Sequence, residues 1–418
     1  MNTLQRKAYN LMYNGYNVFI TGGGGVGKSF LLKQFVRDWR NIKKIGVTSM
    51  TAISSLLIKG RTLHSFLGIG LGTNSVQMME QKIMRKKLYR DRWQKTKVLL
   101  IDEISMMSVE LFEKLEKLAR LLRKNNKPFG GIQLILSGDF CQLPAINTDK
   151  FCFESKKWGE CIDHTIYLTE IIRQKNKTFQ SILQALRMGN ITPEVKRVLG
   201  ECMNRKLKSK NSIKPTRIYS LNKNVNHINI KKLQKLKEKK NEELVEYTLE
   251  YKIHKQKDSY KGFKFLKNLP VNEHLILTKG AQVMLVHNLH PKEGLVNGSR
   301  GVVIGFKNGF PVVRFLNGIE KKVEHHTWEF EEDEKILGYG MQIPLRLAYA
   351  ATIHKLQGST IDYAILHLDS IFEYGMGYVA LSRVRSLEGL SIRSMDLSKF
   401  KAHPKAVEYY TQLERANI

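Results

Sequence analysis

The chain has 418 residues, 42% of them hydrophobic and only nine of them proline, which indicates a folded protein of roughly two to four domains and excludes a disordered chain. Lys and Arg number 69 against 38 Asp and Glu, and the formal net charge of +31 favours a polyanionic partner, although a lysine-rich proteome would give the same excess. No apolar run of about 18 residues occurs, and Arg6, Lys7 and Asn10 interrupt the N-terminus, so we expect an intracellular chain with neither a signal peptide nor a membrane partner.

A glycine-rich loop follows the first predicted strand. Residues 22–29 read GGGGVGKS, the run Tyr16–Thr21 before them is apolar, and an apolar helical spacing follows at Leu31, Phe35 and Trp39. In a strand–loop–helix context this pattern predicts a phosphate cradle, and a glycine turn with a chance lysine is the alternative. The residues expected to bind the nucleotide are Gly22, Gly23, Gly24, Gly25, Val26, Gly27, Lys28 and Ser29, with Lys28 on the β- and γ-phosphates and Ser29 on Mg²⁺. The sequence therefore predicts a protein that binds ATP or another nucleoside triphosphate.

Two further strands are predicted to end in polar residues near this loop. Residues 98–105 read VLLIDEIS and residues 131–144 read GIQLILSGDFCQLP, and each begins with a buried apolar strand. At the carboxyl edge of a parallel sheet, Asp102 suits Mg²⁺ and Glu103 suits polarising an attacking water, although adjacent carboxylates also occur at ordinary helix starts. The Gln142 amide is expected to sense the γ-phosphate.

Phosphoryl transfer also calls for positive charge on the transferring group. Arg173 and Arg383 are the candidates, and we expect both to reach the nucleotide from a second domain. Taken alone, either arginine would be interpreted as a surface residue.

The four cysteines have neither disulfide nor zinc spacing, so we expect buried free thiols rather than a metal site at Cys152, Cys161 and His164.

Residues 282–330 consist mainly of short runs that are typical of β-strands. Asn308-Gly309 and Asn317-Gly318 lie between successive runs and predict tight hairpins. This pattern predicts a small β-barrel inserted into the second half of the chain.

Taken in order, these segments closely resemble the petite-integration-frequency (Pif-one) family of DNA helicases, in superfamily one. The resemblance covers nearly the whole chain. Besides the ATPase motifs it rests on FEKLEKLARLLRKNNKPFGGIQ at 112–133, VTSMTAISSLLIKGRTLHSFLGIG at 47–70, GLVNGSRGVVIGF at 294–306 and YAATIHKLQGSTID at 349–362. Across the first of these segments and the residue before it, the spacing predicts an amphipathic helix with a packing stripe at Leu111, Leu115, Leu118 and Leu122. Met50 and Ala52 depart from the proline and glycine usual in the family, which leaves open whether the local DNA contacts are altered.

The resemblance implies an α/β fold with two RecA-like parallel-sheet motor domains around one ATP. We expect the first motor domain at residues 1–165, with a small inserted strand-separation subdomain at about 61–97. The second is expected at residues 166–418, with the inserted β-barrel at about 241–340. The implied activity is 5′-to-3′ translocation on single-stranded DNA and unwinding of forked duplex by a monomer, in replication, repair or recombination. The resemblance also assigns Gln5 to the adenine base and implies a motor with essentially no N-terminal regulatory region.

The same resemblance places the DNA contacts. The residues concerned are Thr51, His64, Phe66, His354, Lys355, Gln357 and Thr360. A core position is the alternative for His64. Residues 82–97 contain eight basic side chains and one acidic one, with Tyr89 and Trp93 interspersed. This segment is equally compatible with a face that separates the DNA strands and with a solvated helix face.

Two other classes of function are alternatives to a helicase. A small kinase or GTPase would need a phosphate-acceptor site, whereas this chain has two distant arginines and a large positive charge. A DNA-binding module that ATP merely switches could dispense with Glu103 and with both arginines. A DNA helicase driven by ATP and Mg²⁺ fits the sequence best.

Overall fold

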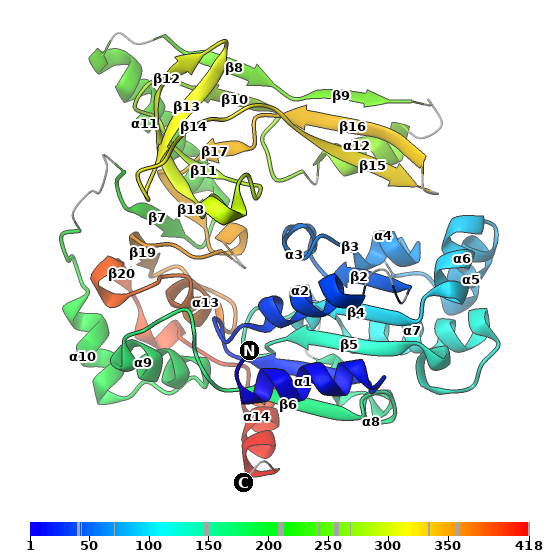
Figure 1. The fold of residues 1–418 in the computed structure, drawn as a ribbon. Coiled ribbons are helices and arrows are strands. Elements are labelled where there is room, and N and C mark those ends of the chain that lie inside the picture. Colours follow the sequence, from blue (N-terminus) through cyan, green and yellow to red (C-terminus); the bar gives the residue numbers. More distant parts are fainter. Residues whose placement is uncertain are drawn as a thin grey trace. The chain divides into compact units, whose positions relative to one another are not determined.

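The structure is a computed structural model. It describes residues 1–39, 42, 44–70, 72–145, 150–207, 213–240, 243–254, 259–267, 269–332, 335–356 and 359–416. The chain forms two compact units (Figure 1). The first contains Met1–Val195, Glu373–Ser382 and Phe400–Ile418, and the second contains Lys196–Phe372 and Arg383–Lys399. The first unit therefore runs past the expected boundary at residue 165 and takes in two later segments, while the assignment of motor domains to residue ranges remains a prediction.

A six-stranded, all-parallel sheet is the centre of the first unit. Its order is β3-β2-β4-β5-β1-β6. The strands are β1 (Val18–Gly22), β2 (Ile45–Ser49), β3 (Arg61–Thr62), β4 (Val98–Asp102), β5 (Gln133–Gly138) and β6 (His164–Leu168). Every residue of β1 and β4 is buried, as expected for strands with both faces covered. The carboxyl ends of β4, β5 and β1 are neighbours, so the three polar segments that follow them meet at one edge.

Helices from both ends of the chain belong to this unit, and several of them pack on the sheet. They are α1 (Thr3–Tyr13), α2 (Lys28–Trp39), α3 (Ala52–Leu57), α7 (Val109–Arg123), α8 (Lys156–Cys161), α9 (Lys177–Arg187), α13 (Met376–Ser382) and α14 (Pro404–Ala416). Helix α14, red in Figure 1, lies next to β6, where the rings of Tyr410 and Tyr167 are 5.5 Å apart. The predicted leucine stripe of α7 is buried along its length, so the amphipathic interpretation of this helix is confirmed.

Three short helices form the region expected as an inserted subdomain. They are α4 (Leu63–Leu67), α5 (Val76–Met84) and α6 (Lys87–Lys95), and α5 and α6 contact α7. Trp93 of α6 is fully buried, and its Nε1 donates to the carbonyl of Leu67 at 3.0 Å. Trp93 is thus a core residue and cannot belong to an exposed strand-splitting face, whereas Lys82, Arg85 and Lys87 are exposed.

The second unit contains its own all-parallel sheet. Its order is β18-β7-β19-β20, with β7 (Thr216–Tyr219), β18 (Ala350–Thr352), β19 (Ala364–Leu368) and β20 (Leu390–Met395). Helix α11 (Asn222–Lys240) packs against β18 and β7, and α10 (Pro193–Glu201) carries the chain from the first unit into the second. One parallel sheet in each unit confirms the predicted α/β fold class.

The remaining strands form three antiparallel sheets, which Figure 1 shows together with α12 (Ser259–Lys267). The sheets are β14-β13-β12-β11-β17, β15-β16-β9 and β10-β8. Their strands are β8 (Val245–Thr248), β9 (Glu250–Ile253), β10 (His274–Leu277), β11 (Gln282–Leu285), β12 (Arg300–Lys307), β13 (Phe310–Phe315), β14 (Glu320–Lys322), β15 (His326–Glu332), β16 (Lys335–Gln342) and β17 (Leu345–Leu347). The two Asn-Gly pairs join β12 to β13 and β13 to β14, which confirms the hairpins. Closure of these strands into a barrel remains a prediction.

No helix in the ranges that the structure describes combines the length and the apolar character needed to cross a membrane.

Candidate nucleotide site

The glycine loop connects β1 to α2, and its backbone path depends on glycine. Gly22, Gly25 and Gly27 have φ of 135°, 90° and 91°, values that residues with a Cβ rarely adopt. A Cβ on Gly22 would also lie 2.2 Å from the carbonyl oxygen of Leu168 in β6. The loop can therefore follow this path only with the residues that the motif supplies.

Gln5, predicted to contact the adenine base, lies beside the loop. Its backbone N–H and side chain form a capping box with Asn2 at the start of α1. Its Nε2 donates to the carbonyl of Val26 at 3.2 Å, and a Cβ on Gly27 would lie 2.5 Å from the same nitrogen. The first helix of the chain thus presents an amide directly to the loop.

The Lys28 ammonium folds back on the loop and lies among carboxylates. Its Nζ donates to the carbonyls of Gly22 at 2.7 Å and Gly23 at 3.0 Å. Burial lowers the pKa of Lys28, although the negative charges of Asp139, Glu103 and Asp102 each act to raise it. The structure therefore brings Lys28, Asp102 and Glu103 together. Ser29, the second residue of α2, is exposed.

Asp102 and Glu103 follow β4 at the same edge of the sheet. Burial raises the pKa of Asp102, and its Oδ1 accepts a hydrogen bond from the Glu103 N–H at 3.0 Å. Glu103 has φ of 56°, an uncommon backbone conformation for a residue with a side chain and one that clusters at functional sites. Since a buried carboxylate is costly unless a cation offsets its charge, and Mg²⁺ prefers oxygen ligands, the Asp102 carboxylate and the Ser29 hydroxyl fit this ion.

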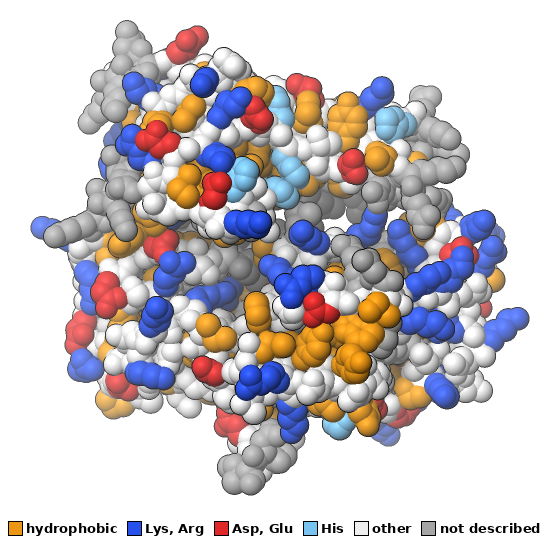
Figure 2. Space-filling model, viewed as in Figure 1, with side chains coloured by type: hydrophobic (Ala, Val, Ile, Leu, Met, Phe, Trp, Pro, Cys, Tyr) orange, Lys and Arg blue, Asp and Glu red, His pale blue; other side chains and the backbone are white. Residues whose placement is uncertain are grey.

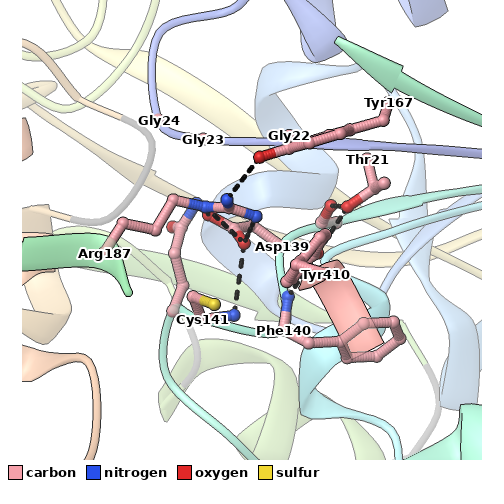
Figure 3. Close-up of polar contacts among 12 residues, drawn as sticks. Thr21, Gly22, Gly23, Gly24, Asp139, Phe140, Cys141, Tyr167, Arg187 and Tyr410 are labelled. Carbon is pink, nitrogen blue, oxygen red and sulfur yellow. Dashed lines mark hydrogen bonds and ion pairs between the residues drawn. The ribbon is translucent and has the colours of Figure 1, made fainter. Parts of the chain in front are cut away.

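A buried ion pair lies next to Gln142, and the sequence did not predict it. Gln142 Nε2 donates to Asp139 Oδ2 at 3.3 Å, and its backbone N–H donates to the Asp139 carbonyl at 2.9 Å. Asp139 in turn accepts from the guanidinium of Arg187, in α9, at 2.9 to 3.2 Å (Figure 3). Both side chains of the pair are 0% exposed. The predicted γ-phosphate sensor therefore rests on a buried Arg–Asp pair.

Aromatic side chains complete the surroundings of Arg187. Its Nη1 donates to the Tyr167 hydroxyl at 2.8 Å, and its guanidinium carbon lies 4.0 Å from the ring centroid of Tyr410. Burial acts to raise the pKa of Asp139, but the charge and the hydrogen bonds of Arg187, with the charge of Lys28 and the Cys141 N–H, together hold that pKa below its usual value. Asp139 therefore stays ionised although no water reaches it.

The Tyr410 hydroxyl links the last helix to two strand ends. It lies 2.5 Å from Thr21 Oγ1 at the end of β1 and accepts from the Phe140 N–H at 3.0 Å (Figure 3). Thr21 Oγ1 also donates to the Gly138 carbonyl at the end of β5 at 2.9 Å. This network holds together the two strands that carry the glycine loop and the Gln142 segment.

The two predicted arginines fall in different units, which corrects one expectation. Arg173 belongs to the first unit rather than to a second domain. Its backbone N–H donates to the Gly25 carbonyl at 3.2 Å, and its Nη1 donates to the Ser382 carbonyl at 2.9 Å. The expected boundary at residue 165 precedes Arg173, whereas the backbone hydrogen bonds to Gly25 keep this segment beside the loop. Arg383 belongs to the second unit, is buried, and accepts at its carbonyl from the Ile361 N–H at 2.9 Å.

Three predicted DNA-binding residues lie near β2 and β3 in the first unit. Thr51 Oγ1 accepts from the Ser54 N–H at 3.2 Å at the start of α3. His64 and Phe66 are half-buried in α4. The Phe66 ring lies 5.1 Å from the guanidinium carbon of Arg92 and packs against Gly46 of β2. Phe66 thus already has packing partners in Arg92 and Gly46, and His64 is not a fully buried core residue.

The other predicted DNA-binding residues lie in the second unit. His354 is exposed on the 3₁₀ turn His354–Leu356, and Thr360 is half-buried. Gln357 and the side chain of Lys355 lie outside the described residues. Of the two family departures, Ala52 begins α3, and Met50 donates its N–H to the Asp102 carbonyl at 3.1 Å. The Met50 position is thereby tied to the end of β4.

All four cysteines are free and buried, as expected. Burial raises the pKa of Cys141 to about 12, so its thiol is protonated at neutral pH.

Replacing Arg187 by Met should destabilise the first unit by about 3–5 kcal/mol, because Asp139 keeps a buried charge without its partner. The thermal unfolding midpoint measures this loss. The double variant R187M/D139N removes both charges and should regain much of the loss. A double variant as unstable as R187M would mean that packing, not charge pairing, accounts for the effect.

The same pair predicts an acid limit. The folded-state pKa of Asp139 lies below its unfolded value of about 3.9, so its stabilisation is present above that pH and is lost as the pH falls through the folded value. The difference in unfolding midpoint between the wild type and D139N should therefore shrink below about pH 4. A constant difference would contradict the pairing.

Comparison with known proteins agrees with this geometry. The family profile described as PIF1-like helicase matches residues 1–197, and the profile described as DNA helicase Pif1, 2B domain, matches residues 265–306. The ATP-dependent DNA helicase PIF1 of Xenopus laevis is 40% identical over 99% of this chain and 65% of its own length. This chain therefore spans somewhat less than two thirds of that relative.

Solved structures match over nearly the full chain. The crystal structure of Pif1 helicase from Candida albicans has a TM-score of 0.83 and 35% identity, covering 99% of both chains. Pif1 helicase from Bacteroides, in complex with ADP-AlF3 and ssDNA, has a TM-score of 0.68 and 28% identity over 99% of this chain and 97% of that chain. With a nucleotide-type loop at the sheet edge, two parallel sheets and these matches, the chain belongs to the PIF1-like helicase family.

Proposed function

We propose that this chain is an ATP-dependent DNA helicase that moves 5′ to 3′ on single-stranded DNA and unwinds duplex. The observation that carries the proposal is the group of charges at the glycine loop, where Lys28 lies among Asp102, Glu103 and Asp139. An ammonium on a loop of backbone amides suits a triphosphate, and carboxylates beside it suit a metal ion and an attacking water.

Each residue of the proposed nucleotide site has its own role in hydrolysis. Lys28 and the loop amides hold the phosphates, Gln5 contacts the base, and Glu103 orients the water. Gln142 senses the γ-phosphate from its position on Asp139. Arg173, beside Gly25, and Arg383 neutralise charge on the transferring group. Mg²⁺, held by Ser29 and Asp102, supplies further neutralisation of the phosphate charge when it is bound.

Single-stranded DNA is the proposed track, and forked duplex is the proposed substrate. The Bacteroides relative was solved with ADP-AlF3 and ssDNA, and this chain carries the charge of +31 that phosphate neutralisation favours. Figure 2 shows Lys and Arg gathered over the region of α5 and α6, where Lys82, Arg85, Lys87 and Lys95 are exposed. We assign strand contact to Thr51, His64, Phe66, His354, Lys355, Gln357 and Thr360.

The protein acts inside the cell as a monomer, in DNA replication, repair or recombination. The two motor domains, expected at residues 1–165 and 166–418, correspond to the two compact units that divide after Val195, with insertions at about 61–97 and 241–340, the second of them a small barrel.

Strand displacement on tailed duplexes tests the proposal. With ATP and Mg²⁺ the chain should displace a strand from a duplex with a 5′ single-stranded tail and not from one with a 3′ tail. K28A should abolish displacement because it removes the phosphate-binding cation. The exposed Lys117 of α7 offers the matched control K117A, which should stay active. Displacement on the 3′ tail alone, or full activity of K28A, would refute the proposal.

Arg383→Ala should leave ATP binding nearly intact and lower DNA-stimulated turnover by roughly 10³ to 10⁵, because an arginine finger acts on charge that develops only in the transition state. Steady-state turnover and equilibrium binding of a fluorescent ATP analogue measure the two effects separately. R393A is the control, since Arg393 lies in β20 of the same unit and donates to Asn204 Oδ1 at 2.8 Å. A comparable loss of binding and turnover in R383A would assign it to ground-state binding.

A further inference from the structure

The Tyr378 side chain lies against the glycine loop within the first unit. Its hydroxyl oxygen accepts a hydrogen bond from the Gly24 N–H at 2.6 Å. A Cβ on Gly23 would lie 3.1 Å from the same oxygen. Tyr378 is 4% exposed, so the contact is shielded from water. An amide of the phosphate-binding loop is therefore already bonded to a protein oxygen.

Helix α13, which carries Tyr378, is held at both ends. At its start, the Gly375 N–H donates to the Lys401 carbonyl at 2.8 Å, and a Cβ on Gly375 would lie 2.4 Å from the Cys141 carbonyl oxygen and 2.9 Å from that of Gln142. At its end, the Ser382 carbonyl accepts from Arg173 Nη1 at 2.9 Å. The helix thus touches the loop, the Gln142 segment and Arg173.

A second contact at the Ser382 carbonyl fixes the same end. Gln174 Nε2 donates to it at 3.1 Å, and Gln174 is buried. Arg173 and Gln174 belong to the segment whose backbone also bonds to Gly25, because the N–H groups of Ile172 and Arg173 both donate to the Gly25 carbonyl. The loop and the end of α13 are therefore joined through the Ile172–Gln174 segment, and the chain continues from Ser382 directly into Arg383.

We propose that the Tyr378 hydroxyl and a phosphate oxygen of the nucleotide compete for the Gly24 amide, so that nucleotide binding displaces Tyr378 from the loop. The inference rests on the proposed nucleotide-binding function. Hydrogen bonds to ionised acceptors are roughly twice as strong as neutral ones, so the exchange favours the phosphate. Tyr378 is then a positioning residue that links phosphate occupancy to the position of α13.

The direction of the effect separates this role from simple packing. Tyr378→Phe keeps the ring and removes the competing oxygen. It should therefore tighten binding of Mg²⁺ with a non-hydrolysable ATP analogue by about 3- to 10-fold, since a neutral hydrogen bond has a net worth of about 0.5–1.5 kcal/mol. A tyrosine that only stabilised the site would give unchanged or weaker binding, and that result would overturn the inference.

Tyr409→Phe is the matched control. Tyr409 is a second tyrosine of the first unit, and its hydroxyl interacts with Thr165 and Trp158 rather than with the loop. Its loss should leave the affinity for the analogue within about 2-fold of the wild type. Equal tightening in Y409F would show that the change is non-specific and would overturn the inference.

A measurement on the unsubstituted fold guards against misfolding of Y378F. Site-specific 3-fluorotyrosine at position 378 should give a ¹⁹F resonance that shifts when the Mg²⁺–analogue complex saturates the site, whereas the label at position 409 should not shift. An unshifted label at 378 under saturation would overturn the inference while leaving nucleotide binding established. Absence of any saturable binding by the wild-type chain would instead refute the proposed function itself.

Discussion

The charge arrangement beneath the glycine loop is the constraint on which the rest of the first unit depends. One ammonium, that of Lys28, lies among three carboxylates at the carboxyl edge of a parallel sheet. The guanidinium of Arg187 offsets the negative charge of Asp139 and donates direct hydrogen bonds to its carboxylate. Among the residues that the structure describes, no arginine bonds to Asp102, and burial raises the pKa of this carboxyl. The paired carboxylate serves architecture, and the one without an arginine serves the metal and phosphate chemistry that we propose.

Segments from distant parts of the chain complete this edge. The first unit contains Glu373–Ser382 and Phe400–Ile418, which follow most of the second unit in sequence. Through Tyr410 and Tyr378 these segments reach the end of β1 and the loop itself. The chain thus leaves the first unit near α10, forms the second unit, and returns to finish the nucleotide site. A chain cut before residue 373 would lack contacts that hold both the loop and the Gln142 segment.

Local patterns predicted the parts of the site that adjacent residues build. The strand–loop–helix pattern, the strand ending in Asp102-Glu103, the leucine stripe of α7 and both Asn-Gly hairpins follow from spacing within a few residues. No local pattern points to Arg187, Tyr378 and Tyr410, because each contacts residues that are distant in the sequence. Tyr410 and Thr21, for example, are 389 positions apart. The core position of Trp93 is not evident from the sequence because most of its neighbours are charged. The place of Arg173 in the first unit is not evident either, because it depends on hydrogen bonds to the distant Gly25.

Amide hydrogen–deuterium exchange, with and without a saturating Mg²⁺–ATP analogue, tests the central claim most directly. If phosphates lie on the backbone amides of the loop, peptides covering residues 22–31 should exchange more slowly in the complex, and the protection should disappear in K28A. Protection confined to peptides remote from this loop, with 22–31 unchanged, would contradict the account.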